Sequence, residues 1–126
     1  MQIPKLAVII PCYNEELCIE KTCRRLLEVL EMLVEKGKIS SDSYIYCVDD
    51  GSNDSTWSII ERLHSETSLV KGATFVRNYG NQKALIAGLE GVRDLGCDCA
   101  VSIDADLQQD ELSIEQFVDE YQKGYD

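Results

Sequence analysis

Four short apolar runs recur along this chain, and each is followed by a polar loop and then by a segment of helical periodicity. We expect strands at residues 6–11, 43–48, 72–76 and 99–103. In the segments between them, apolar residues recur every three or four positions, as they do on one face of a helix. This alternation is typical of a mostly parallel sheet with helices on both faces. The sequence therefore predicts an α/β fold.

Four helices complete the pattern. Asn14 is the expected N-cap of the first helix, with Glu15 and Glu16 in its first turn, and Gly37 would end it. The other helices are expected at about residues 55–65 and 82–95, and in a segment that contains Phe117, Val118 and Tyr121 and ends at Gly124.

The charge of the chain limits its partners. The 126 residues suffice for one domain or part of one, and 23 acidic residues against 12 basic ones give a net charge of −11. This charge argues against unaided binding to nucleic acid or to an anionic membrane surface. An anionic ligand would need a metal ion or backbone N–H groups to offset the repulsion. No apolar run reaches the roughly eighteen residues of a transmembrane helix.

The cysteines predict neither a zinc site nor a redox site. Six cysteines and one histidine are present, without a C-x-x-C pair, so reduced thiols in a cytoplasmic chain are the simpler interpretation. Cys12, Cys47 and Cys99 lie in or beside expected core strands, where free cysteine behaves as a small apolar residue. His64 falls on an expected helix away from the loops, so a Ser–His or Cys–His mechanism has no suitable base.

Polar residues gather in the four loops that follow the strands, PCYNEE, DDGSND, RNYGNQ and DADLQQ. Right-handed crossovers place these loops at one edge of a parallel sheet, where open α/β sheets bind ligands. Neither G-x-x-x-x-G-K-[ST] nor G-x-G-x-x-G is present, so two common phosphate-binding loops are missing. A metal ion would therefore have to neutralise a bound phosphate.

Asp104 and Asp106 follow the fourth strand as a D-x-D pair. They can offer two carboxylate ligands, and Gln108 a third oxygen, to Mg²⁺ or Mn²⁺, which commonly connect a protein to a diphosphate. The alternative is a turn whose aspartates cap the next helix. The position of the pair at a strand end, facing three other polar loops, favours the metal site.

The second loop offers carboxylates for a nucleotide. Asp49 or Asp50 could accept hydrogen bonds from a base N–H or a ribose hydroxyl. An Asx-turn, with Asp54 or Ser55 as the helix cap, explains the same residues about equally well.

The remaining loop residues could complete a nucleotide site. Arg77 and Lys83 could reach phosphate, although a solvated helix face is the alternative for Lys83. Gly80 would let the backbone approach a ligand closely. Tyr13 could flank a nucleobase together with Asn14 and Glu15, which a helix cap explains equally well.

Taken together, the segments IIPCYNEE, VDDGSNDST, RNYGNQKAL and SIDADLQQ resemble the inverting family-two nucleotide-sugar glycosyltransferases with the GT-A fold. The order and spacing are most similar to those of polyprenyl-phosphate glycosyltransferases, which include dolichol-phosphate mannose synthases and bacterial undecaprenyl-phosphate glucosyltransferases. The resemblance spans nearly the whole chain. It implies a Rossmann-like nucleotide-binding half of a GT-A domain.

The resemblance also implies a role for each matching residue. Pro11, Tyr13 and Glu15 would border the nucleobase, Asp49 or Asp50 would contact the base or ribose, and Arg77, Asn78, Gly80 and Lys83 would close over the nucleotide. Asp104, Asp106 and Gln108 would hold Mg²⁺ or Mn²⁺ on the donor diphosphate, which makes Asp104 and Asp106 the expected catalytic residues. The metal would stabilise the departing nucleoside diphosphate, and an acceptor phosphate would attack the anomeric carbon with inversion.

Two departures from the family pattern stand out. Relatives often have a proline-containing turn after D-x-D-L-Q, where this chain has Gln109-Asp110-Glu111. Relatives also continue past the match at residues 124–126 with acceptor-binding loops and often transmembrane helices. We therefore expect residues 1–126 to be the N-terminal, nucleotide-sugar-binding part of a longer protein. That protein would lie at the cytoplasmic face of a membrane, which it would contact only through segments absent here. Alone, this part would turn over little or no substrate.

Other functions stay open at this point. The donor could carry uridine or guanosine, and a cell-surface saccharide could replace the lipid phosphate as acceptor. A metal-dependent phosphoryl-transfer domain also gathers aspartates at strand ends, but its reactive aspartate follows an earlier strand. A non-catalytic α/β module, whose acidic loops only cap helices, would bind neither nucleotide nor metal.

Overall fold

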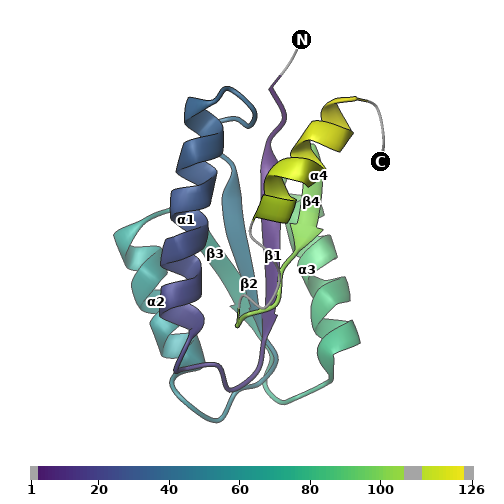
Figure 1. Ribbon diagram of the computed structural model, residues 1–126. Helices are drawn as coiled ribbons and strands as arrows, with labels where there is room; N and C mark the ends of the chain where they lie inside the picture. The colour runs from purple at the N-terminus through teal and green to yellow at the C-terminus, as the bar shows by residue number, and fades with distance from the viewer. Residues whose placement is uncertain (1–2, 107–111, 124–126) are drawn as a thin grey trace.

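The computed structural model describes residues 3–106 and 112–123 (Figure 1). Within these residues, strands and helices alternate, and the strands form one parallel sheet in the order β3-β2-β1-β4. The predicted α/β fold is confirmed. The strands are β1 (Leu6–Cys12), β2 (Tyr44–Asp49), β3 (Val70–Thr74) and β4 (Cys99–Ser102), and the helices are α1 (Ile19–Glu35), α2 (Thr56–Glu66), α3 (Asn81–Leu95) and α4 (Leu112–Gln122).

Strand β1 lies at the centre of the sheet and pairs with both β2 and β4. Ala7 is opposite Tyr44 on one side and Ala100 on the other. The pairing with β4 ends at Ile9, so Pro11, which has no N–H, falls where that edge of β1 no longer needs a donor. A strand buried on both faces requires an almost continuous apolar run, and LAVIIPC supplies it.

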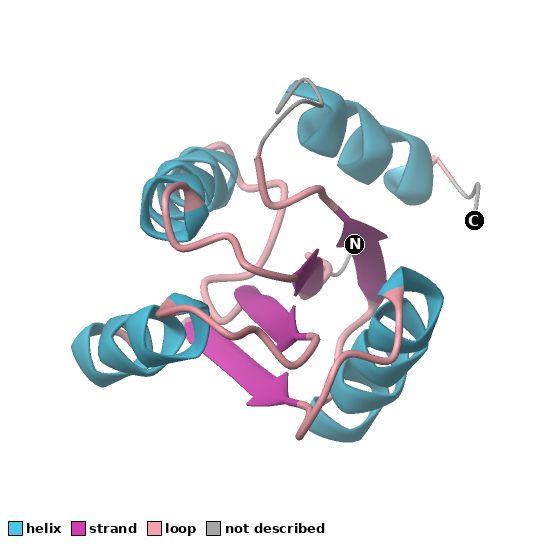
Figure 2. Ribbon diagram, turned by 90° about the horizontal axis from the view of Figure 1, so that it is seen from below, coloured by secondary structure: helices cyan, strands magenta, loops and turns pink. Residues whose placement is uncertain are grey.

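Helices cover both faces of the sheet, as Figure 2 shows. Leu6, Val8 and Ile10 pack into the larger core, to which α1, α2 and α4 contribute apolar side chains. Ala7 and Ile9 point to the opposite face and pack into a smaller core with α3. The period of two along β1 therefore divides its side chains between two cores.

Helix α3 lies very close to the sheet. A Cβ atom on Gly88 would stand 2.5 Å from Cγ2 of Ile9 and 3.3 Å from Cγ2 of Val48. Gly88 is buried, and Ile9 occupies the space that a side chain at residue 88 would need. The glycine that weakens the helix in isolation is needed for its packing.

Two sequence expectations about element ends were wrong. Helix α1 begins at Ile19 with Cys18 as its N-cap, so Asn14 is not the cap. Asn14 instead has a positive φ of 53°, which asparagine tolerates better than most residues. The third strand spans Val70–Thr74, two residues earlier than predicted, because Phe75 already begins the loop.

The structure also places the cysteines and the single histidine. All six cysteines are free, and Cys12, Cys47 and Cys99 are buried. His64 is an exposed residue of α2, and its Nδ1 lies 2.7 Å from the carbonyl oxygen of Val70. No helix in the described ranges is long and apolar enough to span a bilayer.

A network of four charged side chains connects α1 and α2. Arg62 donates to Glu20 at 2.6 Å, and Arg24 bridges Glu20 at 2.9 Å and Glu66 at 3.1 Å. Hydrogen bonds from Arg62 and then Arg24 lower the pKa of Glu20 to about 2. Because these groups are solvent-exposed, salt should screen the network strongly.

We expect Gly88→Ala to lower the free energy of unfolding. Overpacking a core costs about 1–3 kcal/mol, whereas the gain in helix propensity is about 1 kcal/mol or less. Urea unfolding would measure the difference. In an Ile9→Ala background, where Cγ2 is absent, the same substitution should be neutral or stabilising. Equal stabilisation in both backgrounds would contradict the close approach.

We expect Glu20→Gln to flatten the acid branch of the stability curve. A carboxylate whose pKa is lowered in the folded state stabilises it above the unfolded pKa, near 4.5, and loses this contribution as the pH falls toward about 2. Thermal unfolding between pH 5 and pH 2 would compare the two proteins, in low salt and about 1 M NaCl. If stability falls equally with pH in both proteins at low salt, the network does not stabilise the fold through Glu20.

Candidate functional site

The order of the strands creates a topological switch point between β1 and β4. The chain passes from β1 to β2 to β3 on one side, and α3 then carries it to β4 on the other side of β1. Open α/β sheets bind ligands outside the strand ends at such a point. A cavity of about 450 Å³ lies there. Its lining includes the predicted residues Pro11, Tyr13, Glu15, Asp50, Asn78, Gly80, Asp104 and Asp106.

The structure does not place every predicted residue in this cavity. Asp49, Arg77 and Lys83 are absent from its lining. Gln108, the third predicted metal ligand, lies outside the described residues.

Hydrogen bonds join the first loop to the second. The backbone N–H of Asn14 donates to Oγ of Ser52 at 2.8 Å, and its side-chain Oδ1 accepts from the N–H of Asn53 at 2.8 Å. The N–H of Glu15 donates to Oγ1 of Thr56, also at 2.8 Å. The left-handed backbone of Asn14 thus serves to connect two loops.

Helix α2 is capped by Asp54, one of the two predicted candidates. Its Oδ1 accepts from the N–H of Thr56 at 2.9 Å. Ser55 occupies the N-cap position but makes no side-chain capping bond. An aspartate at this end of a helix also interacts favourably with the helix dipole.

Asp50 holds the third loop in place. Its side chain is buried, with 3% exposure. Oδ1 accepts from the N–H of Tyr79 at 2.8 Å, and Oδ2 accepts from the N–H of Gly80 and from Nδ2 of Asn78, both at 3.0 Å. A carboxylate with three such donors is well compensated for its burial.

Gly51 allows the second and third loops to touch. Its φ is +68°, and a Cβ atom there would stand 2.2 Å from the carbonyl carbon of Arg77. Asp49, two residues before Gly51, is 1% exposed and accepts from Oγ1 of Thr74 at 2.6 Å. Both predicted nucleotide-binding aspartates therefore have partners within the protein, and their contact with a base or ribose stays a prediction.

Tyr79, which the sequence analysis missed, gathers the two predicted phosphate-binding cations. The guanidinium carbon of Arg77 lies 4.9 Å from the Tyr79 ring centroid, and Nζ of Lys83 lies 5.6 Å from it. The ring also meets Phe75 edge to face, with the centroids 5.5 Å apart. The signal in the sequence was an aromatic residue between two cations, a combination that favours cation–π contact.

The D-x-D turn alternates between buried and exposed residues. Ile103 and Ala105 are buried, whereas Asp104 and Asp106 are exposed. The N–H of Ile103 donates to the carbonyl of Ile9 at 2.9 Å, and Oγ1 of Thr22 donates to the carbonyl of Ala105 at 2.5 Å. The buried residues anchor the turn and leave both carboxylates on the cavity.

These two carboxylates fit a hard divalent cation. Mg²⁺ in phosphate-transfer sites is commonly held by one or two carboxylates, with substrate phosphates and water as the other ligands. In the described part of the chain, no group of three or more His, Cys, Asp or Glu side chains could hold a metal. With two carboxylates from the protein, the oxygens of a diphosphate could serve as further ligands.

Cys18 stands beside this turn as a protonated thiol. Burial and a hydrogen bond to Glu15 raise its pKa to about 11, and the charge of Asp106 adds to the effect. Its Sγ lies 3.1 Å from Oε2 of Glu15 and 3.6 Å from the carbonyl of Ala105. The thiol is thus a hydrogen-bond donor and a poor nucleophile at neutral pH.

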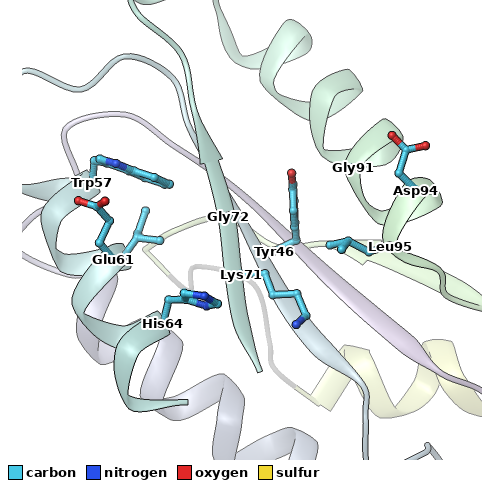
Figure 3. Close-up of a pocket in the computed structure, with 10 residues that line it drawn as sticks. Tyr46, Trp57, Glu61, His64, Lys71, Gly72, Gly91, Asp94 and Leu95 are labelled. Atoms are coloured by element: carbon cyan, nitrogen blue, oxygen red, sulfur yellow. The ribbon is translucent and has the colours of Figure 1, made fainter. Parts of the chain in front are cut away.

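A larger cavity, of about 630 Å³, lies elsewhere (Figure 3). It straddles the edge strand β3, with Trp57, Glu61 and His64 on the α2 side and Tyr46 and Leu95 on the α3 side. None of the predicted site residues lines it. The smaller cavity at the switch point, which collects the loops, is the better candidate for the functional site.

The chain resembles known proteins over nearly its whole length. Residues 7–126 match the model of the family described as Glycosyl transferase family 2. The chain belongs to glycosyl transferase family 2.

This family 2 chain has clear sequence relatives. It is 42% identical over 121 residues to the uncharacterized glycosyltransferase YkoT of Bacillus subtilis, covering 96% of this chain and 36% of YkoT. It is 34% identical to the undecaprenyl-phosphate 4-deoxy-4-formamido-L-arabinose transferase of Shewanella sediminis, covering 96% of this chain and 34% of that protein. The chain thus spans about a third of the length of these relatives.

Solved structures show the GT-A fold. The mannosyltransferase PcManGT from Pyrobaculum calidifontis, in complex with GDP-Man and Mn²⁺, superposes with a TM-score of 0.61 at 23% identity, over 84% of this chain and 28% of that one. S. aureus TarS 1–349 in complex with UDP gives 0.63 at 22% identity, over 94% of this chain and 33% of that one.

We expect Asp50→Asn to loosen the third loop of this family 2 chain. The amide retains one acceptor oxygen for three donors, and an unsatisfied buried group costs about 1–3 kcal/mol. Hydrogen exchange should become faster at the amides of Tyr79 and Gly80. Asp94→Asn, an exposed substitution on α3 with the same change of charge, should leave both amides protected. Unchanged exchange in Asp50→Asn would show that other contacts hold the loop.

Proposed function

We propose that this chain is the N-terminal, nucleotide-sugar-binding part of a metal-dependent glycosyltransferase. The whole protein would transfer a sugar from a UDP- or GDP-sugar to a polyprenyl phosphate, with inversion at the anomeric carbon. The observation that carries the proposal is the placement of Asp104 and Asp106 on one cavity with loops from the other three strands, at the switch point.

Electrostatics support a metal-bound donor. Glu15, Asp50, Asp104 and Asp106 all line the cavity, and the whole chain has a net charge of −11. A diphosphate would be repelled from this site unless cations accompanied it. A divalent metal held by Asp104 and Asp106 would supply them, together with Arg77 from the third loop and Lys83 from the first turn of α3.

The residues have distinct roles in this proposal. Asp104 and Asp106 hold Mg²⁺ or Mn²⁺, which when bound neutralises charge on the departing nucleoside diphosphate. Pro11 and Tyr13 border the base, and Asp50 fixes the loop of Asn78 and Gly80 over the nucleotide. Arg77 and Lys83 lie outside the cavity lining, but both contact the ring of Tyr79, next to Gly80, and would reach the phosphates from there.

One relative and the chemistry of phosphate support this choice of acceptor. The Shewanella sediminis relative is named as a transferase of undecaprenyl phosphate. An acceptor phosphate is already ionised near neutral pH, so its oxygen can attack the anomeric carbon with less help from a general base. A lipid acceptor would place the whole protein at the cytoplasmic face of a membrane.

We expect this chain to bind one of the two nucleotides in a metal-dependent way. Titration calorimetry with UDP and with GDP, each with Mn²⁺ and with EDTA, should give heat for one nucleotide and only with the metal. Asp106→Ala should abolish this binding, because it removes half of the carboxylate pair. Asp94→Ala, an exposed position outside the loops, is the matched control.

Two results would contradict the proposal. Binding that survives both EDTA and Asp106→Ala would exclude the metal role of the D-x-D pair. Binding of neither nucleotide would exclude a complete donor site within these residues.

A further inference from the structure

We propose that Thr22 is the positioning residue of the D-x-D turn, and that its hydroxyl sets where the carboxylate of Asp106 stands. This inference rests on the proposed function, because it concerns the metal and donor site. Thr22 lies in the first turns of α1, outside all four loops, and is 2% exposed. Its Oγ1 donates to the carbonyl of Ala105 at 2.5 Å, across 83 residues of sequence.

The bond acts on Asp106 through the rigid peptide unit. The carbonyl oxygen of Ala105 lies in the same plane as the amide nitrogen of Asp106. A bond that holds this oxygen in place therefore also holds the Cα atom of Asp106, which carries the side chain. On the other side of the turn, the N–H of Ile103 donates to Ile9 at 2.9 Å. Asp104 and Asp106 are thus the exposed members of a turn that is held at both ends.

The hydroxyl of Thr22 is committed to this task. A threonine within a helix commonly turns its hydroxyl back to the carbonyl four residues earlier. The hydroxyl of Thr22 donates instead to the carbonyl oxygen of Ala105, a residue that is 5% exposed. Without it, a buried carbonyl would lose its short hydrogen bond, and the Cys18 thiol at 3.6 Å is a weak substitute.

A metal held by carboxylates is sensitive to such support. Outer partners that orient ligands typically change metal affinity by about 10–100-fold when they are removed. Helix α1 is also packed rigidly, because Ile19, Cys23 and Leu26 are fully buried against the sheet. Through its bond to Ala105, Thr22 therefore ties the exposed carboxylate of Asp106 to a helix that is fixed in the core.

The test compares Thr22→Val, which keeps the shape and removes the hydroxyl, with Thr22→Ser, which keeps the hydroxyl. Mn²⁺ binding in the presence of the nucleotide that the wild type prefers would be followed by the electron paramagnetic resonance of free Mn²⁺. We expect about 10–100-fold weaker binding in Thr22→Val and near wild-type binding in Thr22→Ser. In the metal-free chain, the amide NMR signal of Asp106 should move in the valine variant and return in the serine variant.

A stability control separates positioning from general damage. Leu33→Ala, in the same helix and fully buried, should lower the melting temperature without weakening Mn²⁺ binding. Wild-type affinity in Thr22→Val, or an unmoved Asp106 signal, would overturn the inference while leaving the proposed function standing. A wild-type chain that binds neither Mn²⁺ nor nucleotide would overturn the proposed function itself, and the inference with it.

Discussion

The pairing of β1 with strands on both of its sides is the constraint on which the rest of the structure depends. Because β1 lies between β2 and β4, the loops after these strands must converge at its carboxyl end. The same position demands a strand that is apolar on both faces, and α3 packs so close to one of them that a Cβ atom on Gly88 would stand 2.5 Å from Cγ2 of Ile9. Core packing and site formation therefore have the same origin.

Hydrogen bonds join the first three loops at this edge to one another, and others hold the fourth loop to the sheet and to α1. The first loop is bound to the second through Asn14 and Glu15. The second is bound to the third through Asp50. The fourth is bound to the sheet at Ile103 and to α1 through Thr22. Much of the polarity that marks the loops as functional thus holds the loops together, and Asp104 and Asp106 are the carboxylates that this arrangement presents to the cavity.

The sequence predicted what depends on pattern and topology. Alternating apolar runs were enough for the α/β fold, and the parallel sheet was enough to bring four distant loops together. It could not predict which groups would pair. Asn14 is of a residue type that often caps helices, but it makes loop contacts instead, because the chain turns at a positive φ before α1 begins. Thr22 gave no signal at all, because its partner is a backbone carbonyl 83 residues away, and every residue type has such a carbonyl.

The register of the central strand also determines when the fold can be completed during synthesis. Leu6 pairs with Cys99, a residue that is synthesised much later. Until that distant segment has left the ribosome, one edge of β1 has no strand beside it, and its apolar face lacks part of its cover. Pairings between such remote segments form slowly and leave apolar surface exposed in the meantime. A nascent chain of this topology is thus vulnerable to aggregation until β4 pairs with β1.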